Sequence, residues 1–194
     1  HLKFDKGEFE VVQELTDQFD IEFSFSTVAK FIDMFKGKPV VPKIKGWTNV
    51  GLLIKVFGIL LGMKILQPNA APKTPEKKYL KVKMTLYMVS TALSQLNKGG
   101  DPDMTKFTAK QPERIYQWSV TGTDIACHLI VKAGQTKAGR GKYERRKPFV
   151  HMIFKDVDSA LPILGNQIDT VQAMSQGMVE NEGSPEYGGE IGDL

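Results

Sequence analysis

The side chains best suited to acid–base or nucleophilic chemistry are three histidines and a single cysteine. Cys127 and His128 are neighbours in an expected strand, where adjacent side chains point to opposite faces, which argues against a Cys–His nucleophile pair. His128 and His151 could meet across strands, but two histidines without a nearby carboxylate make a poor metal site. We therefore expect Cys127 to pack as a small apolar residue and both histidines to be ordinary sheet residues.

Acidic residues and glycines give no sharper catalytic signal. The pairs Asp101–Asp103 and Glu180–Glu182 have the spacing of turn or strand-face carboxylates. The glycines between residues 134 and 141 lack the Gly-Lys-Ser/Thr ending of a phosphate-binding loop. The sequence contains no nucleophile elbow, paired-carboxylate site or dinucleotide fingerprint. It therefore predicts a protein that is not an enzyme and that uses no metal or cofactor.

Basic side chains are concentrated in one segment of the chain, residues 132–147. They are Lys132, Lys137, Arg140, Lys142, Arg145, Arg146 and Lys147. We expect a solvated hairpin here, and the alternative is transient contact with an anionic membrane surface through Lys137, Arg140, Arg145 and Arg146. Nucleic acid is a poorer partner because little aromatic character beyond Tyr143 is available for base stacking.

Composition sets the broad class of the protein. With 194 residues, 41% of them apolar and 25% charged, the chain is an ordinary globular protein of one large or two small domains. One cysteine allows no internal disulfide and suits the reducing cytoplasm. Charged residues interrupt the first ten positions, so no secretory signal is expected there. A start at His1 rather than Met leaves open whether residues precede it or follow Leu194.

One order of elements occurs twice in the sequence, which indicates an internal repeat. The first copy has an alternating strand, a helix capped by Ser26 or Thr27, a short strand that ends in glycine, and a second helix. These elements lie at Phe19–Phe25, Val28–Phe35, Val41–Gly46 and Thr48–Leu66. The second copy places its elements at Phe149–Phe154, Val157–Leu164, Met178–Gly183 and Ser184–Leu194.

Other segments complete the expected architecture. Residues 2–15 alternate around Lys6-Gly7 and predict a hairpin. Thr48–Leu66 is strongly apolar, but it is slightly short for a membrane span and holds a lysine near its centre. We expect it to be covered nearly all round or to lean into an apolar cavity. Three prolines make residues 67–75 a linker. After the linker we expect a helix over 76–96 and strands at 115–120, at 126–131 and within 133–147.

The order of elements from Glu76 onward resembles the sterol carrier protein type 2 family. The Trp-containing strand Ile115–Val120, the strand–helix Val150–Val157 and the Gly-ended segment Gln176–Gly183 carry this resemblance. It covers about the last 120 residues, and Phe19–Leu66 resembles the closing half of a second, incomplete copy. Three features depart from the family pattern: Met178 where Lys is common, Pro162 within a helix, and a final helix that stops at Leu194.

The resemblance implies an α+β fold: a mainly antiparallel sheet with covering helices, as a partial unit at 1–66 and a near-complete domain at 76–194. It also implies non-catalytic binding, or transfer, of a lipid or fatty-acyl chain in an apolar tunnel between the sheet and its helices. Large, adaptable side chains such as methionine suit such a lining. The expected lining residues are Leu53, Phe57, Leu60, Met84, Met88, Trp118, Met152, Phe154, Leu161, Met174 and Met178.

A second interpretation uses the same apolar surface differently. The helices at 48–66 and 76–96 hold more apolar surface than one small sheet needs, and the surplus favours either a cavity or a subunit interface. In the second case the chain is an interaction or regulatory module whose apolar helices form a homodimer seam.

Overall fold

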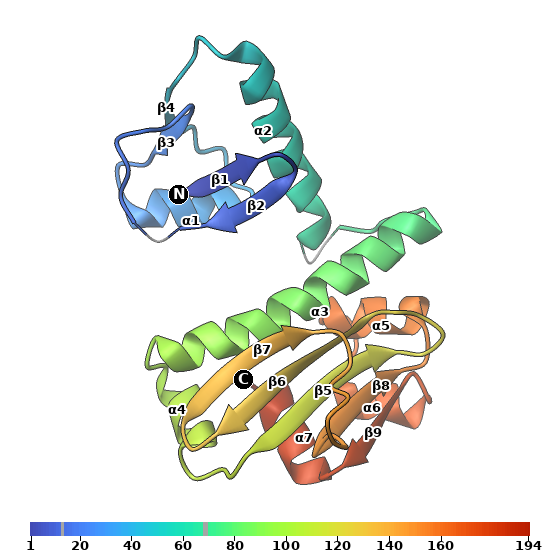
Figure 1. The fold of residues 1–194 in the computed structure, drawn as a ribbon. Helices are drawn as coiled ribbons and strands as arrows, with labels where there is room; N and C mark the ends of the chain where they lie inside the picture. Colours follow the sequence, from blue (N-terminus) through green and yellow to red (C-terminus); the bar gives the residue numbers. More distant parts are fainter. Residues whose placement is uncertain (13, 68–69) are drawn as a thin grey trace. The chain divides into compact units, whose positions relative to one another are not determined.

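The structure is a computed structural model that describes residues 1–12, 14–67 and 70–194. The chain divides into two compact units, residues 1–64 and 65–194, and each is described by itself (Figure 1). Gln13 of the predicted hairpin, and Pro68 and Asn69 of the predicted linker, lie outside the described residues.

Unit 1 contains a hairpin and a second, shorter strand pair with two helices. Its elements are β1 (Leu2–Asp5), β2 (Glu8–Val11), β3 (Glu22–Ser24), α1 (Val28–Phe35), β4 (Lys43–Lys45), α2 (Val50–Gly62) and a 3-10 turn at Met63–Leu66. The hairpin closes at Lys6-Gly7 as predicted, because Gly7 has φ of 87°. The strand expected over Phe19–Phe25 forms only at its centre, where β3 pairs antiparallel with β4.

Unit 1 has a thin core. Among its described residues, Leu53 of α2 is the buried apolar side chain. Phe57 packs edge-on against Phe23 of β3, with ring centroids 6.1 Å apart. The expectation that Thr48–Leu66 is covered nearly all round is wrong, because exposed apolar side chains lie on opposite sides of the helix: Val50, Ile54 and Leu61 on one side and Ile59 on the other. In the part of the chain described, each helix is too short or too polar to span a bilayer.

Unit 2 is an α+β domain built on one five-stranded sheet. Its elements are α3 (Pro75–Lys98), α4 (Pro102–Ala109), β5 (Arg114–Val120), β6 (Ala126–Lys132), β7 (Gln135–Arg140), β8 (Val150–Phe154), α5 (Val157–Leu164), α6 (Thr170–Ser175), β9 (Val179–Gly183) and α7 (Pro185–Gly192). The strand order is β7-β6-β5-β8-β9, and β8 runs parallel to β5 while the other neighbours are antiparallel. The predicted α+β class with a mainly antiparallel sheet is confirmed.

Two helices of unit 2 were missed in the sequence. Asp101 was interpreted as a turn or strand-face carboxylate. Instead, its side chain accepts a hydrogen bond from the Met104 backbone N–H and caps the start of α4, and Asp103 lies in the first turn of that helix. Asp169 caps α6 in the same way by accepting from the Gln172 amide. Both helices have eight residues or fewer, so too few turns were present for the apolar periodicity to be visible.

The two faces of the sheet differ in chemistry. Tyr116, Trp118 and Val120 of β5 belong to the apolar core that packs against the helices. The intervening Gln117 and Ser119 are equally buried, at 4% exposure, and point to the opposite face. The segment that joins β7 to β8 passes over that second face (Figure 1). The sheet therefore has an apolar helix-covered side and a polar side covered by a single loop, residues 141–149, hereafter called the strap.

Candidate functional site

Some of the predicted tunnel residues lie together in the core of unit 2. Trp118, Met152 and Phe154 are buried side chains on the helix-covered face of the sheet. Cα pairing brings Trp118 directly beside Met152 on the neighbouring parallel strand. Leu161 and Met178 are partly buried and pack against the same core. Sequence reasoning therefore grouped residues of β5, β8 and the following helix that are neighbours in space.

The remaining predicted residues lie elsewhere. Met84 is half-buried on α3, whereas Met88 is 47% exposed and Met174 of α6 is 40% exposed. Leu53, Phe57 and Leu60 all belong to α2 in unit 1. Leu53 is buried, Leu60 half-buried and Phe57 exposed. The α2 set and the unit 2 set are thus on different units of the chain.

A half-covered apolar surface, here called the α5–α6 rim, borders the core of unit 2. Its partly buried members are Val157, Leu161, Ile163, Leu164, Ile168 and Met178, and its exposed members are Val171 and Met174. Pro162 lies inside α5, where it has no N–H to donate, and Asn166 just beyond the helix adopts φ of 56°. The short helix and its left-handed exit keep these side chains at the edge of the core.

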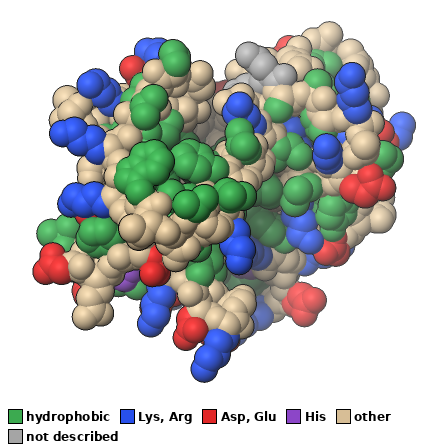
Figure 2. Space-filling model, turned by 90° about the horizontal axis from the view of Figure 1, so that it is seen from above, with side chains coloured by type: hydrophobic (Ala, Val, Ile, Leu, Met, Phe, Trp, Pro, Cys, Tyr) green, Lys and Arg blue, Asp and Glu red, His purple; other side chains and the backbone are tan. Residues whose placement is uncertain are grey.

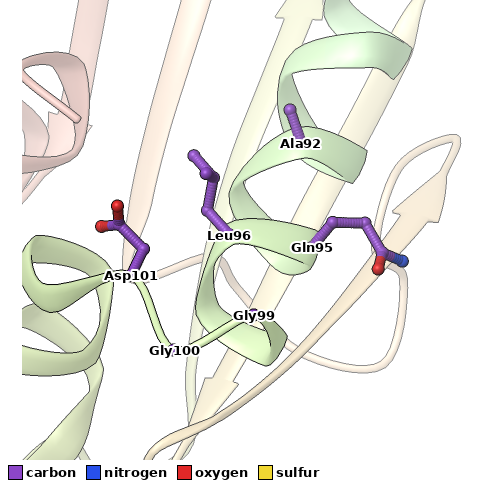
Figure 3. A pocket seen from close by; sticks show the side chains of 6 residues that line it. All are labelled: Ala92, Gln95, Leu96, Gly99, Gly100 and Asp101. Atoms are coloured by element: carbon purple, nitrogen blue, oxygen red, sulfur yellow. The ribbon is translucent and has the colours of Figure 1, made fainter. Parts of the chain in front are cut away.

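Two open grooves lie at the other end of α3. The first has a volume of about 520 Å³ and is lined by Ala92, Gln95, Leu96, Gly99, Gly100 and Asp101. In it the Gln95 side chain points away from those of Leu96 and Asp101 (Figure 3). The second, of about 620 Å³, is lined by α4 and α7, with Phe107 and Tyr187 among mixed charges. The lining of neither groove includes a predicted tunnel residue.

Arg114 stands beside the second groove and was not singled out in the sequence. Its guanidinium carbon lies 4.1 Å from the Phe149 ring centroid and 4.3 Å from that of Tyr187. Its Nη1 atom is buried with no hydrogen-bond partner among the described residues. The cation is therefore held by aromatic faces, and its role is to join β5 to α7.

A polar network occupies the other face of the sheet. The Ser119 hydroxyl lies 2.8 Å from Nε2 of His151, and the Gln117 amide nitrogen lies 3.2 Å from the same atom. The Gln117 amide oxygen accepts the backbone N–H of Tyr143 at 2.7 Å. Burial lowers the pKa of His151; the nearby Glu182 carboxylate opposes this shift and Lys142 adds to it.

The strap is held at two further points. The His128 ring contacts the Gly141 carbonyl at 3.0 Å through Nδ1 and packs edge-on against Tyr143. The glycine at 139 makes room for this ring, because a Cβ there would overlap it. Arg146 pairs with Glu113, which also binds Lys132 at 3.0 Å. The two cations lower the pKa of Glu113, Lys132 having the larger effect through its hydrogen bond.

His128 and His151, which could have met across strands, do not lie on neighbouring strands. They lie on β6 and β8, and β5 runs between those strands, with Gln117 paired to both. The predicted separation of Cys127 from His128 is confirmed, since Cys127 lies buried in the apolar core. Over the described ranges, His, Cys, Asp and Glu side chains form no group of three that could hold a metal ion.

The elements of unit 2 include, in order, those predicted from Glu76 onward: a helix, three antiparallel strands, a fourth strand, a helix, a Gly-ended strand and a final helix, with the missed helices α4 and α6 between them. Unit 2 therefore has the α+β architecture with a mainly antiparallel sheet that the resemblance to sterol carrier protein type 2 implies. The repeat in unit 1 remains a prediction.

No family model and no curated protein matches the sequence. Solved structures that match include sterol carrier protein 2 like 2 from Aedes aegypti, 17% identical over 58% of this chain and 98% of that one, with a TM-score of 0.38. The sterol carrier protein domain 2 of Helicoverpa armigera is 16% identical over 64% of this chain and 91% of its own, at 0.40. A double mutant of the sec-alkyl sulfatase PisA1 is 16% identical over 63% of this chain but 16% of its own, at 0.37. Matches at these values assign neither ligand nor activity.

Proposed function

We propose that unit 2 binds a lipid or fatty-acyl-type ligand without chemical conversion, and that the ligand enters at the α5–α6 rim. The observation that carries the proposal is the incomplete burial of the apolar side chains of the α5–α6 rim. Several large apolar side chains pack against the core there, yet remain half-exposed, and Met174 and Val171 extend the apolar surface outward. An acyl chain laid on this surface would remove both partners from water, at about 25 cal/mol per Å².

The rim also has the adaptability that such a ligand needs. Met174 lies in α6 and Met178 follows it, and unbranched thioether side chains repack around guests of different shape. The α5–β9 connection contains one short helix, α6, and a left-handed residue at Asn166, so local opening costs less there than in the five-stranded sheet. Trp118 and Met152 lie deeper, buried in the core that the rim borders.

Displacement of a fluorescent fatty acid tests the proposal on the full chain. We expect saturable binding, and we expect Met174→Asp to weaken it by tenfold or more, since an unpaired charge on an apolar contact is costly. Met88→Asp is the matched control because Met88 is an equally exposed methionine on α3. Equal affinities for the two variants, or no saturable binding by the wild type, would refute the α5–α6 rim as the ligand site.

Contact with an anionic membrane is a natural extension for a carrier. Lys137, Arg140 and Arg145 are exposed, whereas Arg146 is already paired with Glu113. We expect Arg145→Glu to reduce retention on phosphatidylserine vesicles. Lys110→Glu is the control, because Lys110 is an exposed lysine outside the basic segment 132–147. A single cysteine is compatible with the cytoplasmic setting predicted from the sequence.

A homodimer is the second candidate, and exposed apolar side chains along α3 favour it. Leu80, Met88 and Leu96, spread over the length of the helix, are 45%, 47% and 42% exposed. Exposed hydrophobic side chains are not confined to α3: Figure 2 shows a patch of them on one face of the molecule, among scattered Lys and Arg. Sedimentation velocity separates the two functions: a dimer that Met88→Asp dissociates and Met174→Asp leaves intact supports the seam.

The internal repeat is proposed on matched turn geometry. Gly46 follows β4 with φ of 91°, and Gly183 ends β9 with φ of 98°. In both, a Cβ would strike a backbone carbonyl shortly before the paired strand: that of Asp20, two residues before β3, in one case, and that of Phe149, one residue before β8, in the other. An eight-residue helix follows the first strand of each pair, α1 and α5. Unit 1 would then be the closing half of a second sterol-carrier-like unit.

A further inference from the structure

The orientation of one amide fixes the protonation state of a histidine. The backbone N–H of Tyr143 can only donate, so the Gln117 atom that lies 2.7 Å from it is the amide oxygen. The other end of that amide, an NH2 donor, faces Nε2 of His151 at 3.2 Å. A donor there requires an acceptor, so Nε2 of His151 carries no proton and the ring is neutral, with its proton on Nδ1.

Ser119 is consistent with that assignment. Its hydroxyl lies 2.8 Å from the same Nε2 atom and can donate to it. Ser119 and Gln117 are both 4% exposed, so water has little access to replace a lost partner. Two side chains on one face of β5 therefore both present a donor to Nε2 of His151.

Protonation of His151 creates a conflict that the network cannot resolve in place. The hydroxyl of Ser119 can rotate and accept from the new Nε2–H, but the NH2 group of Gln117 cannot. If the amide turns over to present its oxygen to His151, its NH2 group then faces the N–H of Tyr143. In the first arrangement the hydrogen bond between Gln117 and His151 is lost, and in the second the hydrogen bond from Tyr143 to Gln117 is lost. The protonated His151 therefore regains a partner only when the strap is released at Tyr143.

We propose that His151, Gln117 and Tyr143 form a proton-sensitive latch that holds the strap on the sheet when His151 is neutral and loosens it when His151 is protonated. The groups that face the imidazole are Ser119 and Gln117 from β5, Glu182 opposite it on β9, and Lys142 from the strap itself. His128 lies on the far side of Gln117 and holds Gly141.

The latch acts on the segment that carries much of the basic cluster. Lys142, Arg145 and Lys147 are exposed on the strap, and its far end is tied by the Arg146–Glu113 ion pair. Loosening at Tyr143 would therefore free the middle of the strap, between Gly141, which His128 holds, and Arg146, which Glu113 holds. This inference does not rest on lipid binding by the α5–α6 rim.

Amide hydrogen exchange of the full chain, followed by NMR between pH 7.5 and 5, tests the latch. After correction for intrinsic exchange, we expect the protection of the Tyr143 amide to fall about fivefold to tenfold, the value of one net hydrogen bond. The fall should follow the titration of the His151 ring signals. The amide of Gly141, which donates to Ala126 at 2.8 Å, is the internal control and should keep its protection.

Two variants give the opposite outcomes that a latch requires. Gln117→Glu places a carboxylate oxygen, an acceptor, toward both His151 and Tyr143. The Tyr143 amide should therefore stay protected at pH 5, and His151 should titrate at higher pH than in the wild type. His151→Gln removes the titrating group, so Tyr143 protection should not depend on pH. A pH-dependent loss that persists in His151→Gln overturns the proposal. If either variant fails to fold, the wild type alone still tests the proposal. A pH midpoint for the loss of Tyr143 amide protection that differs from the pH midpoint of the His151 ring signals also overturns it.

Discussion

Gly183, the last residue of β9, lies so close to Phe149 that a Cβ atom on the glycine would collide with the Phe149 carbonyl oxygen. The contact arises where β9 ends beside the start of β8, since Val150 pairs with Gly183. It also sets the entry into α7, because the Ser184 amide donates to that same carbonyl. The position excludes a side chain on two counts: the space is occupied, and φ is 98°.

Replacing this glycine should therefore destabilise unit 2 strongly. Gly183→Ala combines left-handed strain, about 1–2 kcal/mol, with a backbone clash that β8 and β9 must separate to relieve. Gly122→Ala is the matched control, since Gly122 has φ of 72° and open space around its missing Cβ. Urea unfolding in a Trp47→Phe background, so that fluorescence reports Trp118 alone, should place the midpoint of Gly183→Ala well below that of Gly122→Ala. Equal urea midpoints for the two variants would show that the close approach of Gly183 to the Phe149 carbonyl does not add to the loss of stability.

Cys127 should be chemically silent in the folded protein. Burial raises the pKa of its thiol to about 12, and the thiol lies 3.3 Å from the Leu86 carbonyl as a donor. We expect no alkylation by iodoacetamide at pH 8 until unit 2 opens, and rapid alkylation in urea. Because an unfolded thiol ionises near pH 8.5, well below the folded value, the free energy of unfolding should decrease as the pH rises above about 8.5. Alkylation at the rate of a free thiol in native buffer would contradict the buried position.

The strands of unit 2 could be predicted because their patterns are clear. Ile115–Val120 alternates between apolar and polar residues, and Ala126–Val131 is a nearly uninterrupted apolar run; both patterns are typical of strands. The glycine at 183 also marked the end of β9 correctly. By contrast, α4 and α6 are too short for periodicity, and their only signals are the capping residues Asp101 and Asp169.

The polar side of the sheet could not be predicted for a different reason. Gln117 and Ser119 read as the solvent side of an alternating strand, yet the strap buries them. Nothing in the sequence says that residues 141–149 fold back over β5, because that contact is long-range and is made by one amide and two ring groups. The tunnel residues of α2 were grouped with those of β5 by analogy with the repeat, which is a statement about topology rather than packing.

Lys81 should act as the anchor of the segment that precedes α3. Its ammonium donates to the backbone carbonyls of Gln67 at 3.0 Å and Ala70 at 2.5 Å, and burial lowers its pKa. Lys81→Met keeps the length and apolar stem of the side chain but removes these donors. We expect unit 2 to remain folded while limited proteolysis at Lys73 becomes faster. Lys77→Met, on the exposed first turn of α3, is the control, and the same increase in both variants would argue against a specific anchor.

Finally, the stability of unit 2 should decrease on the acid side of neutrality because of His151. Burial lowers the pKa of this histidine in the folded chain, whereas in the unfolded chain it titrates at about 6.5. As the pH falls through that value, the unfolded state takes up the proton first, so the free energy of unfolding decreases until the folded pKa is reached. Above about pH 7.5 the contribution is fully present. Urea midpoints measured from pH 8 to 5 should therefore converge for wild type and His151→Gln as the pH falls, with the wild type the more stable at pH 8. Parallel pH profiles for the two proteins would assign the acid sensitivity to other groups.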